Sequence, residues 1–156
     1  MKLPPDWNEF IGLLSSHRVR FLVIGAHALA AHGRPRATLD LDLLVAPTEP
    51  NARRLGAALA DFGFPAAARA WRRLAKPDRM VTLGTPPLQI DILTSITGVS
   101  FARAWKGRHR GRFGTHDVAF LGETELRINK GATGRTKDRL DLELLNETQP
   151  RRRPRS

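Results

Sequence analysis

The length and composition of this chain of 156 residues indicate a globular domain and exclude several protein classes. Apolar residues make up 41% of the sequence, enough for a hydrophobic core, and the absence of cysteine excludes disulfides and cysteine-ligated metals. The formal net charge of +11 favours polyanionic partners such as RNA or DNA over cationic small molecules. Because 21 of the 26 basic residues are arginine, this charge can also reflect genomic base composition.

We expect one domain over residues 1–148, followed by a disordered basic tail over 149–156 that holds four arginines. No stretch approaches the roughly 18 consecutive apolar residues that a membrane-spanning helix requires. The N-terminus also lacks the apolar segment of a signal peptide. The sequence therefore predicts a cytoplasmic protein with no membrane partner.

The first half of the chain predicts helices that alternate with strands. Asp6 and Glu9 form a capping-box pattern, so a helix is expected from about Asp6 to Ser16. Apolar or Ala-rich runs bounded by turn residues predict the next elements. These are a strand, a helix, a strand and a helix at 21–24, 26–32, 39–45 and 51–62.

The second half predicts a hairpin, one more strand and three helices. Two apolar runs at 79–83 and 88–93, joined by Gly84–Pro87, indicate the hairpin. The other elements are a helix, a strand and two helices at 101–105, 116–121, 123–132 and 136–145. Thr136 is a plausible cap for the last helix, 106–112 is expected to be a basic loop, and 65–78 has no assignable pattern. This order predicts an α/β (α+β) fold with a mixed central sheet of about five strands flanked by helices.

Two carboxylates interrupt the apolar strand at 39–45. Residues two apart in a strand point to the same face, about 6.5 Å from each other, so Asp40 and Asp42 share one face. The opposite face is expected to enter the core with Leu39, Leu41, Leu43 and Val45. The strand at 88–93 has the same design, with Leu88, Ile90 and Ile92 on one face and Gln89 and Asp91 on the other. If the two strands are neighbours, three carboxylates converge.

Three converging carboxylates predict a metal site. Carboxylates that lie so near one another repel, which raises their pKa values, and a bound cation removes this repulsion. Carboxylates without cysteine favour hard ions such as Mg²⁺ or Mn²⁺ over Zn²⁺. Such clusters support metal-dependent phosphoryl or nucleotidyl transfer. The alternative is a solvated outer face, which is the commoner explanation of a lone Asp-x-Asp on a strand.

The residues between the first two strands offer groups that can hold phosphate. Gly25-Ala26 ends a strand and begins a helix, where backbone N–H groups can approach a phosphate, although turn glycines are common without one. Arg34 and Arg36 can clamp phosphate oxygens or be ordinary loop charges. Thr38 can place the following strand by a local hydrogen bond. His27 and His32 are better explained as packed or surface side chains than as phosphate ligands.

Together these residues resemble the signature of the DNA polymerase β-like nucleotidyltransferase superfamily. In that family a strand leads to Gly-Gly or Gly-Ser, and Asp-x-Asp follows after a short helix, as Gly25-Ala26 and Asp40-Leu41-Asp42 do here. The family's third aspartate, on a later strand, corresponds to Asp91. Ala26 departs from the pattern because it offers no hydroxyl to a phosphate, although the backbone contact remains open.

The C-terminal segment resembles small bacterial members of the superfamily that are related to abortive-infection toxins. The similarity lies in Lys130 and in the run Arg135-Thr136-Lys137-Asp138-Arg139-Leu140-Asp141. By this resemblance Lys130 and Lys137 would neutralise triphosphate charge, and Asp138 and Asp141 would orient them. The other explanation of these charges is a salt-bridged, solvated helix surface.

The resemblance implies a reaction and assigns residues to it. Asp40 and Asp42 would bridge two Mg²⁺ ions, and Asp91 would complete one site and help to activate an acceptor hydroxyl. That hydroxyl would attack the α-phosphate of a nucleoside triphosphate such as ATP, and pyrophosphate would leave. The residues expected to contact the nucleotide are Gly25, Ala26, Arg36, Thr38, Lys130 and Lys137.

Two hypotheses about the biological function stay open. The first is an enzyme that modifies RNA, tRNA or protein, including the toxin of a toxin–antitoxin pair with an antitoxin partner. The second is an inactive relic of the fold that binds nucleic acid or a partner protein. Ala26 and the basic tail favour this second hypothesis. Retention of Asp40, Asp42 and Asp91 favours the enzyme, because a relic has no reason to keep an uncompensated charge cluster.

Overall fold

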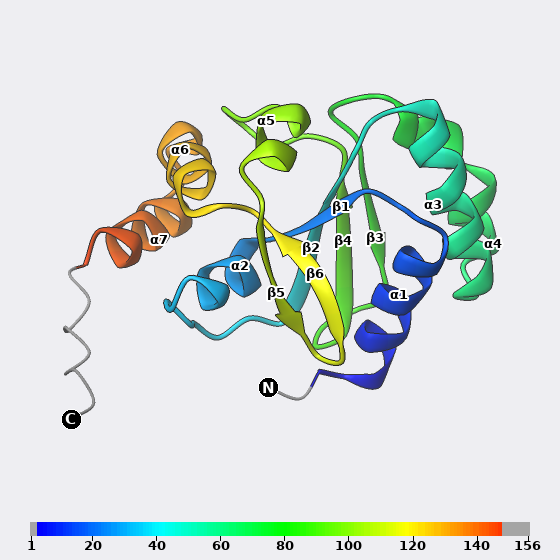
Figure 1. The fold of residues 1–156 in the computed structure, drawn as a ribbon, viewed down its shortest axis with the longest axis horizontal. Helices are drawn as coiled ribbons and strands as arrows, with labels where there is room; N and C mark the ends of the chain where they lie inside the picture. The colour runs from blue at the N-terminus through cyan, green and yellow to red at the C-terminus, as the bar shows by residue number, and fades with distance from the viewer. Residues whose placement is uncertain (1–2, 148–156) are drawn as a thin grey trace.

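A computed structural model describes residues 3–147, which form a mixed α/β fold around a six-stranded sheet (Figure 1). The strands are β1 (Phe21–Ile24), β2 (Asp40–Val45), β3 (Met80–Leu83), β4 (Gln89–Leu93), β5 (His109–Phe113) and β6 (His116–Phe120). They lie in the order β3-β4-β2-β1-β6-β5. The pairs β2–β4 and β1–β6 are parallel, whereas β1–β2, β3–β4 and β5–β6 are antiparallel. The predicted α/β class and mixed sheet are confirmed.

The expected count of five strands is wrong because β5 lies where a basic loop was expected. Its residues His109-Arg110-Gly111-Arg112-Phe113 pair with β6 in an antiparallel hairpin. A strand at the edge of a sheet has one partner and needs little apolar surface, so charged residues are common there. The hydropathy alternation that identifies buried strands is therefore absent from this one.

Helices cover both faces of the sheet. They are α1 (Pro5–Ser16), α2 (Gly25–Ala31), α3 (Glu49–Asp61), α4 (Pro65–Arg69), α5 (Phe101–Lys106), α6 (Glu123–Thr133) and α7 (Thr136–Asn146), with a 3-10 helix at Trp71–Ala75. In Figure 1, α1, α3 and α4 lie on one side of the sheet and α2, α6 and α7 on the other. No helix in residues 3–147 is long and apolar enough to cross a membrane.

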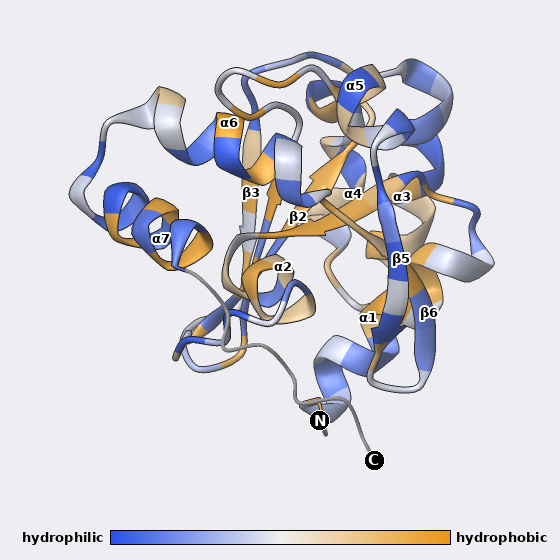
Figure 2. Ribbon diagram, turned by 60° about the vertical axis from the view of Figure 1, so that its left-hand side comes forward, coloured by the Kyte–Doolittle hydropathy of each residue, from blue (hydrophilic) through white to orange (hydrophobic). Residues whose placement is uncertain are grey.

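Two apolar cores lie on the two faces of the sheet, and the central strands feed both. Along β1, Phe21 and Val23 pack with α1 and α3, whereas Leu22 and Ile24 pack with α2 and α6. This double burial makes β1 apolar along its whole length, whereas β2 and β4 carry carboxylates among their apolar residues; orange dominates the central strands in Figure 2. Asp40, Asp42 and Leu44 point to the second face, so the carboxylates share it with α2 and α6.

Two apolar residues expected in the core lie outside the strands. The structure begins β2 at Asp40 and β4 at Gln89, so Leu39 and Leu88 precede them and are 63% and 41% exposed. Both predictions extended an apolar run by one residue. The ladder of β2 and β4 begins at Asp40 and Gln89, and the residue before each strand is a bend outside the pairing, so its side chain is not buried by the sheet.

The expected side-chain caps at Asp6 and Thr136 are wrong. Helix α1 begins at Pro5 after Pro4, and no side chain caps it; Asp6 lies within the first turn. Proline at the first helical position fits the helix without a cap, because it has no N–H to satisfy. Helix α7 begins at Thr136 itself, so this residue cannot cap it. The predicted tail at 149–156 lies outside the described residues.

Candidate active site

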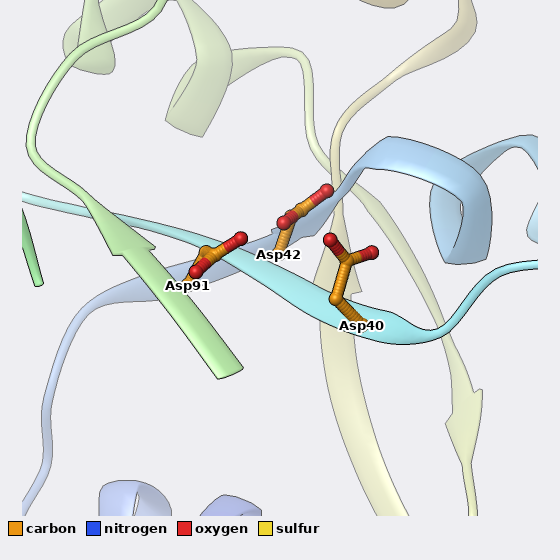
Figure 3. Close-up of side chains that lie close together, drawn as sticks. All are labelled: Asp40, Asp42 and Asp91. Atoms are coloured by element: carbon orange, nitrogen blue, oxygen red, sulfur yellow. The ribbon is translucent and has the colours of Figure 1, made fainter. Parts of the chain in front are cut away.

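The pairing of β2 with β4 brings the three predicted carboxylates together. In this parallel ladder Asp42 lies opposite Asp91, and Asp40 lies one pleat away on the same face. Carboxylate oxygens of Asp40, Asp42 and Asp91 all lie within 4.8 Å of one another. Figure 3 shows the three side chains on the same side of the two strands. The condition for the convergence of the three carboxylates, that the two strands are neighbours, is therefore met.

Two of these carboxylates are held by hydrogen bonds, and the third is not. The Thr38 hydroxyl donates to Asp40 at 2.8 Å. Asp91 accepts from the Thr82 hydroxyl at 2.8 Å and from the Gln89 amide at 3.0 Å. No donor among residues 3–147 bonds to the Asp42 carboxylate. Asp42 thus has open lone pairs in the middle of the cluster.

The central carboxylate has a raised pKa. Burial, followed by repulsion from Asp40 and Asp91, raises the pKa of Asp42 to about 6, although Lys137 and Lys130 partly oppose this. A carboxyl group in such surroundings is unstable as an anion unless a cation approaches it. Three carboxylates and no cysteine or histidine form a donor set suited to Mg²⁺ or Mn²⁺. The residues present therefore fit a hard divalent ion.

A cavity of about 500 Å³ opens over the carboxylates. Five cationic side chains line it, namely Arg36, Arg79, Lys130, Arg135 and Lys137. They come from the loop before β2, the residue before β3, helix α6, the turn between α6 and α7, and helix α7. A cavity with carboxylates at its base and cations around them suits a ligand that carries phosphates and a metal ion.

A buried network of ion pairs holds the Lys130 ammonium group in place. Its Nζ atom lies 2.9 Å from a carboxylate oxygen of Asp138 and 2.9 Å from one of Asp141. The side chains of Asp138 and Asp141 are each 2% exposed. Arg36 binds Asp141 with two nitrogens, at 2.7 and 3.1 Å. The expected phosphate clamp Arg36 is thus already paired, and it ties the loop before β2 to α7.

Asp138 is a strong anion at the centre of this network. Burial would raise its pKa, but hydrogen bonds from Thr133 and Lys130, the charge of Lys130 and a hydrogen bond from Arg135 lower it to about 2. Asp138 therefore remains ionised at any physiological pH. Lys137, one residue earlier, is exposed and forms no ion pair within the described chain. The two lysines of the motif consequently differ: one is buried in a network, and the other is available.

The structure places some predicted contact residues at the cavity and others away from it. Gly25, Arg36, Lys130 and Lys137 line the cavity with the three aspartates. The Ala26 side chain is buried and does not line it. Thr38 does not line it either, and reaches the site only through its bond to Asp40.

The remaining polar residues between the first two strands have structural partners. Arg34 donates to the carbonyl oxygens of Leu144 and Glu147, so it holds the end of α7. His27 contacts the carbonyl oxygen of Asp40 at 3.2 Å, and burial lowers its pKa. His32 contacts the carbonyl oxygen of Leu121 at 2.8 Å. The interpretation of both histidines as packed side chains agrees with these contacts.

Sequence reasoning missed one wall of the cavity. Asp78, Arg79 and Met80 line it at the start of β3, and Ser95 lines it after β4. The Ser95 hydroxyl donates to the Asp78 carboxylate at 2.8 Å and joins the two ends. The predicted hairpin was the available signal, because antiparallel pairing places the residue before β3 beside the residue after β4.

Gly25 allows the close approach of α2 to the carboxylates. Its φ is +66°, and a Cβ atom at this position would lie 2.5 Å from a carboxylate oxygen of Asp42. We expect Gly25→Ala to lower the free energy of unfolding by about 1–3 kcal/mol and to weaken Mg²⁺ binding roughly tenfold or more. The reason is that the new methyl group strains the backbone and also displaces Asp42. Titration calorimetry and thermal unfolding measure the two effects.

Gly134 offers a matched control for this substitution. Its φ is +67°, and no heavy atom lies within 4 Å of the position that a Cβ atom would take there. Gly134→Ala should carry the backbone strain alone and leave Mg²⁺ affinity unchanged. Equal loss of Mg²⁺ affinity in both variants would contradict the role given to the Asp42 contact.

Comparison of the sequence with protein-family models finds no match, and comparison with curated proteins finds none either. The resemblance to the polymerase β-like nucleotidyltransferases therefore stays a prediction.

Proposed function

We propose that this protein is a Mg²⁺-dependent nucleotidyltransferase, which moves a nucleoside monophosphate from a nucleoside triphosphate to an acceptor hydroxyl on RNA, tRNA or protein. The observation that carries the proposal is the cluster of Asp40, Asp42 and Asp91, whose oxygens lie within 4.8 Å at the base of a cation-lined cavity. Mn²⁺ is the alternative metal. When bound, the ion would neutralise the carboxylates and polarise the α-phosphate.

The cationic side chains divide into fixed and available charges. Lys130, Arg36 and Arg135 are engaged by Asp138 and Asp141. Lys137 and Arg79 form no ion pair with any described residue, so they can neutralise triphosphate oxygens without losing a partner. Lys137 is thus the better candidate for the triphosphate contact, whereas Lys130 is held in the cavity wall by Asp138 and Asp141.

Asp91 is the best candidate for the group that takes the acceptor proton. Its carboxylate faces the cavity and is oriented by the Thr82 hydroxyl, which donates to one oxygen, and by the Gln89 amide, which lies 3.0 and 3.1 Å from the two oxygens. In the proposed reaction the acceptor oxygen forms a bond to the α-phosphorus. The bond to the bridging oxygen breaks, pyrophosphate leaves, and the acceptor proton moves to Asp91.

One of the two observations that favoured an inactive binding module no longer supports it. It was favoured by Ala26, which lacks a hydroxyl for a phosphate. The Ala26 side chain is 5% exposed and does not line the cavity, so a hydroxyl on its Cβ atom would be buried away from a bound phosphate. The enzyme is therefore the function that the geometry supports better.

The direct test is transfer of labelled nucleotide. The protein is incubated with each of the four α-labelled nucleoside triphosphates, Mg²⁺, and a mixture of cellular RNA and protein, and EDTA replaces Mg²⁺ in the control. Label on RNA or protein that needs Mg²⁺ supports the proposal and identifies the nucleotide and the acceptor class. No label from any triphosphate, with folded protein, would overturn it.

The raised pKa of Asp42 predicts a pH-dependent response to Mg²⁺. The folded-state pKa of about 6 exceeds the ordinary value of 3.8, so the unpaired carboxyl favours the folded state below about pH 4. That contribution, at most about 3 kcal/mol, is lost as the pH rises through 6. A metal ion binds the ionised carboxylate of the folded protein and thereby restores the stability lost at this pH. We therefore expect 10 mM Mg²⁺, roughly saturating for a weak carboxylate site, to raise the melting temperature at pH 7.5 much more than at pH 5.

Thermal unfolding with Mg²⁺ or EDTA at the two pH values measures this response. Asp117→Asn is a matched control, because Asp117 is an exposed carboxylate on β6 away from the cavity. This variant should keep the pH-dependent response. An equal rise in melting temperature at both pH values in the unaltered protein would contradict the assignment of Asp42 as the responding group.

A further inference from the structure

A second cavity lies apart from the carboxylates, and we refer to it as the Trp105 pocket. It has a volume of about 670 Å³. The residues that line it include Arg20, Ala46, Arg54, Phe101 and Trp105. None of these residues lines the cavity over the aspartates. The pocket therefore belongs to a different part of the surface, between α5, the start of α3 and the residue before β1.

The charge of this pocket is purely positive. Arg20 and Arg54 are its charged side chains, and both are exposed. Within residues 3–147 neither guanidinium forms an ion pair. Arg20 instead lies over the Trp105 ring, with its central carbon 5.5 Å from the ring centre. Two unpaired guanidinium groups beside apolar walls suit a ligand that combines negative charge with a flat apolar body.

The apolar wall of the pocket is aromatic. The rings of Phe101 and Trp105 stack with a centre-to-centre distance of 5.7 Å and an angle of 20°. Arg108 also lies against Trp105, at 4.2 Å from the ring centre. Aromatic rings interleaved with arginines are the arrangement by which proteins bind the bases and phosphates of single-stranded nucleic acid.

A basic ribbon of sequence, residues 103–112, begins beside the pocket on α5 and continues into β5. Residues 103–112 contain no carboxylate and five cations, of which Arg112 pairs with Asp117 on β6: these are Arg103, Lys106, Arg108, Arg110 and Arg112. Cations on an edge strand also prevent pairing between sheets, which accounts for Arg110 and Arg112 without a ligand. That explanation does not extend to Arg20, which precedes the central strand β1, or to Arg54, which lies on α3.

The Trp105 pocket lies at the end of the sheet, where α5 on the carboxylate side meets the start of α3 on the opposite side. Phe101 and Trp105 pack against the core that contains Leu44, and Leu44 shares its strand face with Asp42. Ala46, which lines the pocket, follows Asp42 by four residues, or about 13 Å of extended chain. A strand of a few nucleotides is long enough to occupy the pocket while another part of it lies near the aspartates.

We propose that the Trp105 pocket and the ribbon 103–112 bind single-stranded nucleic acid, with a base against the apolar wall and phosphates on Arg20 and Arg54. This binding requires no metal and no triphosphate. It does not depend on the nucleotidyl transfer proposed for the carboxylates, and it extends that function by a binding site for a polymer.

The test measures binding of fluorescein-labelled 12-mers by the full chain in EDTA, using fluorescence anisotropy. The ligands are an oligoribonucleotide, the oligodeoxyribonucleotide of the same sequence, and the corresponding duplex. We expect the single strands to bind more tightly than the duplex, because only unpaired bases can stack. Comparison of the two single strands shows whether the site is selective for RNA.

The variant Arg20→Ala/Arg54→Ala should bind the single strand about tenfold more weakly at about 100 mM salt, with a salt dependence lower by about 1.4 in the logarithmic slope. The matched control is Arg69→Ala/Arg139→Ala, which removes the same charge at exposed positions outside the pocket. It should stay within about twofold of the unaltered protein. The four arginines of 151–155 are present in every variant, so a difference in affinity between the two double variants measures the contribution of the pocket.

Several results would overturn the proposal. They are no binding of the single strand, equal losses in the two double variants, tighter binding of the duplex, and competition by inorganic polyphosphate as strong as that by the oligonucleotide. A dimer of the chain that dissociates in Arg20→Ala/Arg54→Ala would also overturn it, since a second copy would then cover the pocket. Asp42→Asn separates this test from the transferase, because it should retain the binding of single strands in EDTA.

Discussion

Asp42→Asn is expected to reduce nucleotidyl transfer by roughly a thousandfold or more while it raises the melting temperature of the metal-free protein. Activity falls because the amide removes the central anionic ligand of the cluster. Stability rises because burial and the repulsion by Asp40 and Asp91, which raise the pKa of Asp42, no longer oppose the fold. These opposite signs distinguish a site residue from a structural one, for which both quantities would fall.

The measurement combines single-turnover transfer of an α-labelled nucleotide with thermal unfolding at pH 7.5 in EDTA. Asp117→Asn serves as the matched control, because its carboxylate is exposed and pairs with Arg112 on the surface at 3.3 Å. It should change neither quantity appreciably. Transfer by Asp42→Asn at a rate close to that of the unaltered protein would refute the proposed metal site. A lower melting temperature would refute the charge argument alone.

Lys130→Met is expected to lower the free energy of unfolding by about 3–5 kcal/mol. The substitution leaves Asp138 and Asp141 buried without their shared cation, and each of these side chains is 2% exposed. Arg36 and Arg135 remain as partial partners, so the loss should be large without being complete. Denaturant unfolding followed by circular dichroism measures the change.

Lys137→Met is the control that the same motif supplies. Lys137 is exposed and has no ion pair in the part of the chain that the structure describes, so its loss should cost less than about 0.5 kcal/mol. Its effect should appear instead in the KM for the triphosphate, which we expect to rise about tenfold because one phosphate contact is removed. Similar losses of stability in the two variants would contradict the division between fixed and available charge.

This pair of lysines shows a limit of reading the sequence. Both belong to the C-terminal segment 130–141, whose charges are compatible with a functional helix or with a solvated one. The packing of α6 against α7 buries Lys130 against Asp138 and Asp141, and leaves Lys137 beside the cavity. The sequence does not reveal this difference, because which side of a helix is buried depends on the neighbouring helix that packs against it.

Arg36 and β5 show the same limit in two other ways. Arg36 was expected to contact phosphate, yet Asp141 already binds it, a contact between residues 105 positions apart that local spacing does not reveal. Strand β5 was expected to be a loop because its residues are basic. Its strand conformation depends on β6, which offers a free edge at the end of the sheet.

The sequence by itself determined which faces of the strands carry carboxylates, because the alternation of side chains along a strand follows from local backbone geometry. It thereby identified Asp40, Asp42 and Asp91, the short helix after Gly25 and the hairpin of β3 and β4. The tertiary structure decided that β2 and β4 are parallel neighbours with Asp42 opposite Asp91. It also decided which cations are buried in pairs and where the Trp105 pocket lies. These outcomes depend on contacts between distant segments, whose energies exist only once the chain has brought the segments together.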